Sequence, residues 1–235
     1  MEFITHNALF GIVISLIAFE IGLFIYRKTK LAIFNPLLIA IILIIIFLSL
    51  THTSFDTYNK GAQFINLLLG PSTIILAVPL YKQLDLLKKH ALPILLGVFI
   101  GCISSILGVV LVSTLVGLDK NLLLSLVPKS VTTPIGLEIS KQLNGLLPIT
   151  VAAIILSGII GAIIGPLIFK IFKIKNKVAQ GISLGTASHA VGTTKALELG
   201  ETEGAMSSLS IGISGLMTVF LAPIIITFLS KIFIK

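Results

Sequence analysis

The chain has 235 residues, of which 56% are hydrophobic and 11% are charged. An ordinary soluble domain carries charge on about a quarter of its residues, so this composition excludes one. A membrane β-barrel is excluded too, because runs such as Ile39–Leu50 are apolar without alternation. The sequence therefore predicts an all-α polytopic membrane protein, which we interpret as one integral membrane domain over residues 1–235.

The net charge of +8 lies in short loops between apolar segments. That distribution is typical of membrane topology and argues against a nucleic-acid-binding surface. The single cysteine, Cys102, falls inside an apolar segment, where a small core residue is expected. An intramolecular disulfide is excluded, and we expect the lipid bilayer to be the first partner of the chain.

About six full transmembrane spans are predicted from the apolar segments. In chain order they are Ala8–Tyr26, Leu37–Leu50, Gly61–Tyr81, Leu92–Val116, Leu146–Phe169 and Ala205–Phe228. Between the second and third we expect an outer loop, Thr51–Lys60. The third span is interrupted by Gly70-Pro71, which frees backbone carbonyls that lipid cannot satisfy. It should face the bundle interior, with Asn66, Ser72 and Thr73 as supporting polar residues.

Two polar stretches interrupt this apolar pattern, Pro128–Gly145 and Gly181–Gly204. Set 60 residues apart, they align Val131 with Val191, Thr133 with Thr193 and Glu138 with Glu198. Paired polar, Gly- or Pro-interrupted segments mark the binding site in many secondary transporters. The pattern favours an inverted repeat, in which each stretch is a re-entrant or a broken helix.

The basic loops at 27–30, 82–89 and 170–177 decide between these two arrangements. If both polar stretches are re-entrant hairpins, all three loops lie in the cytoplasm and the N-terminus lies outside. If both are complete broken crossings, the last loop falls outside the cell. Charge favours the hairpins, although a broken crossing stays open. The localisation that follows is a bacterial cytoplasmic (inner) membrane.

Each polar stretch also contains a predicted helix start. Thr132-Thr133-Pro134 begins one half-helix, and Gly192-Thr193-Thr194 begins another that ends at Gly200. Helix N-termini carry free N–H groups and a positive dipole that favour anions. We therefore predict a small-anion site, with Glu138 and Glu198 as supporting acids. Its predicted substrate-binding residues are Lys129, Ser130, Thr132, Thr133, Ser188, His189, Thr193, Thr194 and Lys195.

Several of these residues have a second interpretation. His189 is either protonated to balance the anion, because imidazole changes charge near neutral pH, or a buried hydrogen-bonded histidine. Lys129 and Lys195 either bind the anion or extend to a headgroup or an aqueous vestibule. Glu201 and Glu203 are expected to be loop acids.

Enzyme chemistry is not predicted. The sequence has no GxSxG elbow, no HExxH pair and no Walker loop, and the adjacent Ser188 and His189 do not by themselves form a nucleophile–base pair. No metal site and no cofactor are expected.

Three segments resemble one known family. PKSVTTPIGLEIS (128–140), GTASHAVGTTKALELGETEGAMSS (185–208) and LGPSTIILAVPLYKQ (69–83) are similar to the LrgB/CidB family of bacterial membrane proteins, whose plant relatives are plastid glycolate/glycerate transporters. The resemblance implies a small holin-like membrane partner of the LrgA/CidA type. It also implies an antiholin-like role that affects murein hydrolase activity and lysis, or transport of carboxylates such as pyruvate or glycolate.

The sequence therefore supports two functions. The first is a secondary transporter or facilitator of small monocarboxylates that works with the LrgA/CidA-type partner. The second is an antiholin-like regulatory subunit that modulates murein hydrolase activity and lysis without transporting. The paired, cation-bearing half-helices favour transport, because a holin antagonist has no need of them. Substrate identity, coupling ion and a homo-oligomeric state are left open.

Overall fold

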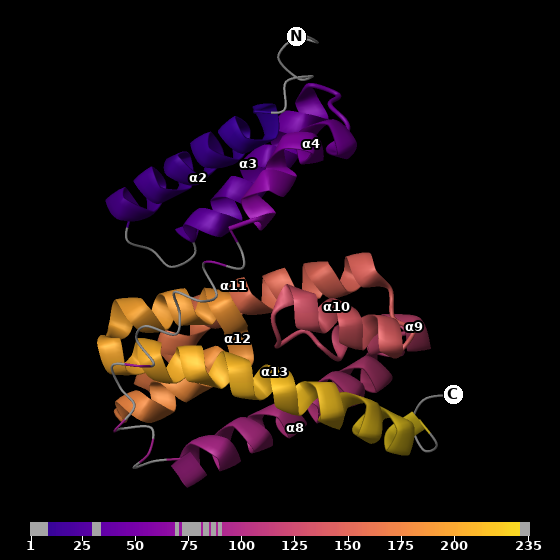
Figure 1. Cartoon of the computed structure of the whole chain (residues 1–235), viewed down its shortest axis with the longest axis vertical. Coiled ribbons are helices and arrows are strands. Elements are labelled where there is room, and N and C mark those ends of the chain that lie inside the picture. Colours follow the sequence, from indigo (N-terminus) through magenta and orange to yellow (C-terminus); the bar gives the residue numbers. More distant parts are fainter. Residues whose placement is uncertain are drawn as a thin grey trace. The chain divides into compact units, whose positions relative to one another are not determined.

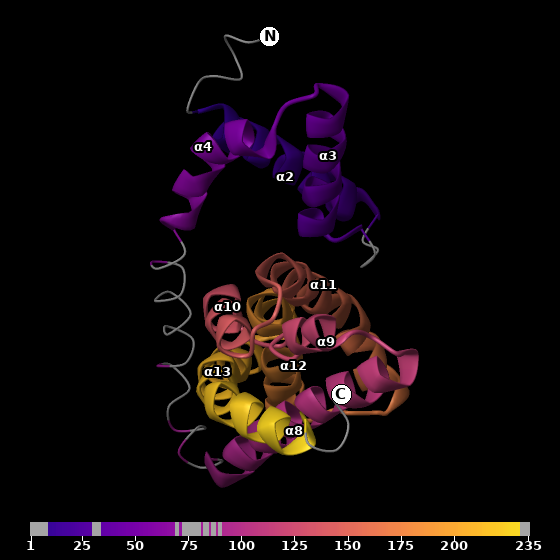
Figure 2. The same ribbon diagram turned by 90° about the vertical axis from the view of Figure 1, so that its right-hand side faces the viewer.

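The computed structural model describes residues 9–29, 34–68, 71, 81, 85, 88 and 91–230. Within these residues all regular elements are helices and no strand occurs, which confirms the all-α class (Figures 1 and 2). The helices are α2 (Phe10–Thr29), α3 (Pro36–Leu50), α4 (Phe55–Asn66), α8 (Ala91–Val116), α9 (Lys120–Leu126), α10 (Thr133–Gln142), α11 (Leu147–Ile171), α12 (Lys177–Leu199) and α13 (Glu201–Ser230).

Four of the described helices, α2, α8, α11 and α13, are long and apolar enough to cross a membrane, and α3 is a shorter apolar helix. The polytopic membrane prediction is therefore confirmed. The third predicted span lies largely outside the described residues, as do Ser72, Thr73 and the side chain of Asn66.

The described chain forms two compact units, 1–75 and 76–235. In the first, α2 packs against both α3 and α4. Gly11 of α2 lies directly against the α4 backbone at Tyr58, whose hydroxyl is 2.7 Å from Ser15 Oγ. The predicted outer loop is wrong in its second half, because Ser54 caps a helix that begins at Phe55. The single domain over 1–235 stays a prediction.

In the second unit, α8, α11 and α13 are the long helices, and α9, α10 and α12 lie among them (Figure 2). One core cluster joins α8, the segment between α9 and α10, and α13 through Ile106, Val127 and Ala222. Another joins α8 to the start of α13 and includes Cys102, which is 3% exposed, as expected of a core residue.

The second polar stretch, α12, folds back on itself. Its two halves both pack on α13, where Glu203 and Gly204 contact Gly181 of the first half and Leu197 of the second. In a straight helix Gly181 and Leu197 would lie about 24 Å apart at 1.5 Å per residue. A Cβ on Gly192 would also collide with the carbonyl of Leu184. α12 is therefore a helical hairpin, with the geometry predicted for a re-entrant element.

The first polar stretch contains one short helix, α10, and together with the short helix α9 that precedes it forms a second hairpin, whose two helices are linked through α11. The Thr150 hydroxyl lies 2.9 Å from the Ser125 carbonyl of α9 and 2.6 Å from Ser140 Oγ of α10. Ser125 Oγ also accepts the backbone N–H of Leu146 at 2.6 Å. At about 1.5 Å per residue, neither helix reaches across a hydrocarbon core of about 30 Å. The placement of both hairpins in a membrane stays a prediction.

Because α12 packs closely against α13, adding a single methyl group between the two helices is expected to lower the stability of the protein. Gly185→Ala would place a Cβ against the backbone of Ser207, which cannot move aside as a side chain can. We expect a loss of stability of about 1–3 kcal/mol in detergent, measured by chemical or thermal unfolding. The matched control is Gly108→Ala in α8, where a Cβ meets nothing within 4 Å and helix propensity gains up to about 1 kcal/mol. Equal stability of the two variants would contradict the packing described.

Candidate functional site

The turn of the α12 hairpin is at His189. Its backbone adopts φ 42° and ψ −133°, a left-handed conformation that a non-glycine residue adopts only when its surroundings hold it there. The ring provides one anchor, since Nε2 lies 2.9 Å from the carbonyl oxygen of Ile154 in α11. That oxygen can only accept, so Nε2 carries a proton and donates. Protonation of the second ring nitrogen, which the charged form requires, stays a prediction.

Gly158 provides the space for this ring. A Cβ there would lie 2.6 Å from His189 Cε1, and a Cβ on the neighbouring Gly161 would collide with Ser188 Oγ. The sequence predicted that a half-helix starts at Gly192-Thr193-Thr194, and that position is wrong, because the returning half of α12 begins directly after the turn at His189. Gly192 lies in the returning half, where the lack of a side chain lets the two halves touch.

Residues beyond the turn are spread over two environments. Thr193 is fully buried, and its hydroxyl binds the His189 carbonyl and Ser207 of α13 at 3.1 and 2.7 Å. Thr194 is exposed, with its hydroxyl bonded to its own helix. Lys195 forms an ion pair of 2.7 Å with Glu198. None of these three residues lines the two cavities described below.

In the first polar stretch, Lys129 and Ser130 lie between α9 and α10. Lys129 Nζ donates to Ser130 Oγ at 3.2 Å and to Ser105 Oγ of α8 at 3.5 Å, and the two hydroxyls are 2.9 Å apart. We call Lys129, Ser130 and Ser105 the lysine–serine cluster. Within the part of the chain that the structure describes, no carboxylate pairs with this lysine. A partly buried ammonium therefore lacks a counter-ion.

The other predicted residues of the first polar stretch contribute less to the site. Thr132 is the N-cap of α10, as predicted, but its side chain makes no capping hydrogen bond. Thr132 and Thr133 are half-buried, and neither lines a cavity beside the cluster. Glu138, on the same helix, is exposed.

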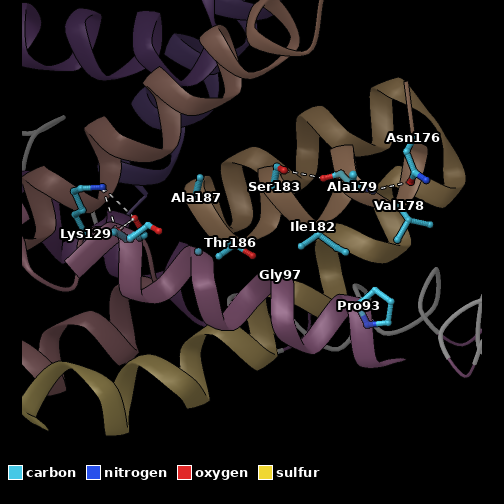
Figure 3. Close-up of a pocket in the computed structure, with 14 residues that line it drawn as sticks. Pro93, Gly97, Lys129, Asn176, Val178, Ala179, Ile182, Ser183, Thr186 and Ala187 are labelled. Carbon is cyan, nitrogen blue, oxygen red and sulfur yellow. Dashed lines mark hydrogen bonds between the residues drawn. The ribbon is translucent and has the colours of Figure 1, made fainter. Parts of the chain in front are cut away.

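Two cavities meet at Lys129. One, of about 710 Å³, lies between α8 and the first half of α12, and the other, of about 600 Å³, lies between α11 and that same half. Lys129, Ser183 and Ala187 line both cavities. Figure 3 shows the first cavity, with Lys129 at one end and Asn176 at the other. The tip of the α12 hairpin thus stands between two spaces that share one cation.

Each cavity also has a buried hydroxyl without a partner. Thr186 lines the first cavity and Ser188 the second; the two residues are 7% and 1% exposed, and their hydroxyl oxygens are enclosed without a hydrogen-bond partner. The site is therefore positive and rich in donors. This chemistry suits a small anion, and no group of metal-binding side chains occurs in the described residues.

Two residues of this site were not predicted, Ser105 and Thr186. The sequence did show Gly101 and Ser105 four residues apart, a spacing typical of close helix packing. That packing is present, because Gly101 faces the methyl group of Thr186. The spacing did not indicate that Ser105 would also contact Lys129, which lies in a different part of the chain.

Comparison with known proteins shows the family of the chain. The chain matches the LrgB-like family over residues 15–228, a range that includes both hairpins. It belongs to the LrgB-like family. Similar proteins named "Antiholin-like protein LrgB" occur in Bacillus cereus (strain B4264) and Bacillus anthracis (strain A0248). Each is 39% identical over 226 residues, which cover 96% of this chain and 98% of the relative. No solved structure matches.

Within this LrgB-like site, His189→Ala is expected to loosen the hairpin turn. It removes the bond to Ile154 and leaves alanine in a left-handed backbone, so we expect a stability loss of about 1–3 kcal/mol. Hydrogen exchange should rise at residues 186–193, as measured by mass spectrometry. Thr194→Ala, exposed on the same hairpin, is the control. Unchanged exchange at 186–193 would show that His189 does not hold the turn.

Proposed function

We propose that this chain acts as an antiholin-like membrane protein, which restrains lysis together with a small holin-like partner of the LrgA/CidA type. The proposal is supported by family membership and by the name of the relatives, which align with this chain almost from end to end. It accounts for a multi-pass protein without predicted enzyme chemistry.

Complementation tests this role. In a Bacillus cereus strain that lacks its own LrgB, expression of this chain is expected to restore the parental rate of autolysis and the parental level of murein hydrolase activity. The rate of autolysis is measured as loss of turbidity, and murein hydrolase activity is measured on gels that contain cell wall. An empty vector is the control. If membrane-inserted protein leaves both at the level of the vector, the antiholin-like proposal fails.

The site adds a second candidate function, the transport of a small monocarboxylate such as pyruvate or glycolate. The observation that carries it is Lys129, a partly buried cation without a carboxylate partner that opens on two cavities. A cation away from bulk water is costly unless an opposite charge compensates it. A small carboxylate supplies that charge, and the serines of the cluster donate to its oxygens.

The hairpin tips give this site its transporter-like character. Ser130 comes from the first polar stretch, and Thr186 and Ser188 from the second, so an anion at Lys129 contacts both stretches. Small shifts of the α12 tip between α8 and α11 would change which cavity is open to the anion. The two functions are compatible, because carboxylate flux can set the timing of lysis indirectly.

Uptake into proteoliposomes tests the transport proposal. Labelled pyruvate and glycolate should enter the vesicles saturably. Uptake is measured in two separate preparations, one with the LrgA/CidA-type partner and one without it. Lys129→Gln is expected to weaken apparent affinity about 10- to 100-fold, the loss of a charge-assisted contact of roughly 1.5–3 kcal/mol. Lys141→Gln, an exposed lysine at the end of α10, is the matched control.

The same variants separate the two candidate functions. If Lys129→Gln abolishes both uptake and lysis control, transport is the physical step behind regulation. If it abolishes uptake alone, the regulatory role is independent of the site. Absence of saturable uptake for the folded wild-type protein, across a panel of small acids and with the partner present, would contradict the transport proposal.

A further inference from the structure

We propose that the second cavity, between α11 and the first half of α12, holds one anionic phospholipid. An acyl chain of the lipid lies along α11, and its phosphate lies beside Lys173 and Lys175 in the turn that joins the two helices. The lipid uses the end of the cavity opposite to Lys129, so this site goes beyond the anion site and does not depend on transport.

The first observation is that the second cavity has a polar end and an apolar end. Lys129 and Ser188 line it at the tip of the α12 hairpin, whereas Ile160, Ile164 and Ile168 line it toward the turn between α11 and α12. The three isoleucines are 51%, 41% and 41% exposed, on a helix long and apolar enough to cross a membrane. We call this apolar end the isoleucine groove. A small anion finds no partner along it, whereas an acyl chain packs against it.

The second observation is the length of the isoleucine groove. From Ile160 to Phe169, which also lines the cavity, α11 rises about 14 Å at 1.5 Å per residue. One leaflet fills about half of a hydrocarbon core of about 30 Å, so the groove matches the depth of one acyl chain. Ser183 lines this part as well, but its hydroxyl is already bonded to the carbonyl of Ala179 at 2.8 Å.

The third observation is the charge where the isoleucine groove reaches the end of α11. Ile174 lines the cavity in the turn, between Lys173 and Lys175, which are both exposed. Consecutive Cα atoms are about 3.8 Å apart, so each lysine begins beside the cavity. In the part of the chain that the structure describes, neither lysine pairs with a carboxylate. Basic pockets beside transmembrane helices at the membrane surface are typical binding sites for anionic headgroups.

The turn that carries these lysines is fixed by hydrogen bonds. The backbone N–H of Ile174 donates to the carbonyl of Phe169 at 2.8 Å, with Lys173 in a left-handed conformation at φ 54°. The side chain of Gln180 in α12 donates to the carbonyl of Ile174 at 2.6 Å. The turn therefore presents both lysines from a defined backbone, beside the groove rather than on a free loop.

Native mass spectrometry of the purified full chain tests the headgroup site. The protein is mixed with equal amounts of phosphatidylglycerol and phosphatidylcholine that carry the same acyl chains. The wild-type protein is expected to prefer phosphatidylglycerol about 30-fold at its tightest site, since each lysine near an anionic headgroup contributes about fivefold. The double variant Lys173→Gln, Lys175→Gln should reduce this preference about 10-fold or more. The control is Lys120→Gln, Lys141→Gln, two exposed lysines that do not line the cavity.

A second set of variants tests the position of the acyl chain. Ile164→Trp fills the isoleucine groove and is expected to remove the tightest complex with either lipid. Ile168→Trp repeats the test one turn nearer to the lysines, so the result does not depend on one variant folding. Leu167→Trp is the control, because Leu167 is 55% exposed on α11 but does not line the cavity. Thermal unfolding of each variant verifies its fold.

The outcomes separate the two parts of the proposal. Equal binding of both lipids by the wild-type protein, or an unchanged preference in the double lysine variant, overturns the headgroup site. Unchanged binding in both folded tryptophan variants overturns the acyl chain in the groove. Glycerol phosphate carries the charge without a chain, and it should not displace the lipid; displacement would show a site for free phosphates instead. None of these results bears on uptake at Lys129, which is tested separately.

Discussion

The turn at His189 is the constraint on which the second unit depends. A polar helix of the length of α12 would otherwise run straight through the bundle. Instead its backbone takes a left-handed conformation at one residue, and the His189 ring donates to the Ile154 carbonyl of α11. Glycines remove the side chains that would obstruct this path: Gly158 accommodates the ring and Gly192 lets the halves touch. Without these contacts, a non-glycine residue would not hold such a conformation.

The turn determines what the two polar stretches can do together. It presents Thr186 and Ser188 at the tip of a hairpin, beside a lysine that comes from the other stretch. Among the residues that the structure describes, this brings together a lysine without a carboxylate partner, the two cavities that it lines, and the unpartnered hydroxyls of Thr186 and Ser188. In a setting of low polarity these groups interact strongly with any small anion that reaches them. This is the physical link that we propose between an LrgB-like fold and the movement of a carboxylate.

Much of the architecture could be predicted from the sequence, because apolar length and basic loops report on membrane helices directly. Both polar stretches were found for the same reason, as polar residues set within apolar surroundings. The break was misplaced because Gly192 in sequence resembles a helix start, whereas its role is a contact between chain halves. Glu203, expected in a loop, is 4% exposed in the first turn of α13. Thr186 and Ser105 become site residues through tertiary contacts, which periodicity does not encode.

The most direct test of the α12 hairpin is the distance between the two ends of α12. Spin labels at Lys177 and Leu199, both exposed, are introduced into a Cys102→Ser chain in lipid, and their separation is measured by electron paramagnetic resonance. The hairpin predicts that these helix ends lie close together, with spectra broadened by short-range coupling. A continuous helix would hold the labelled backbone positions about 33 Å apart. A single population at that longer distance would contradict the hairpin, and with it the site at Lys129.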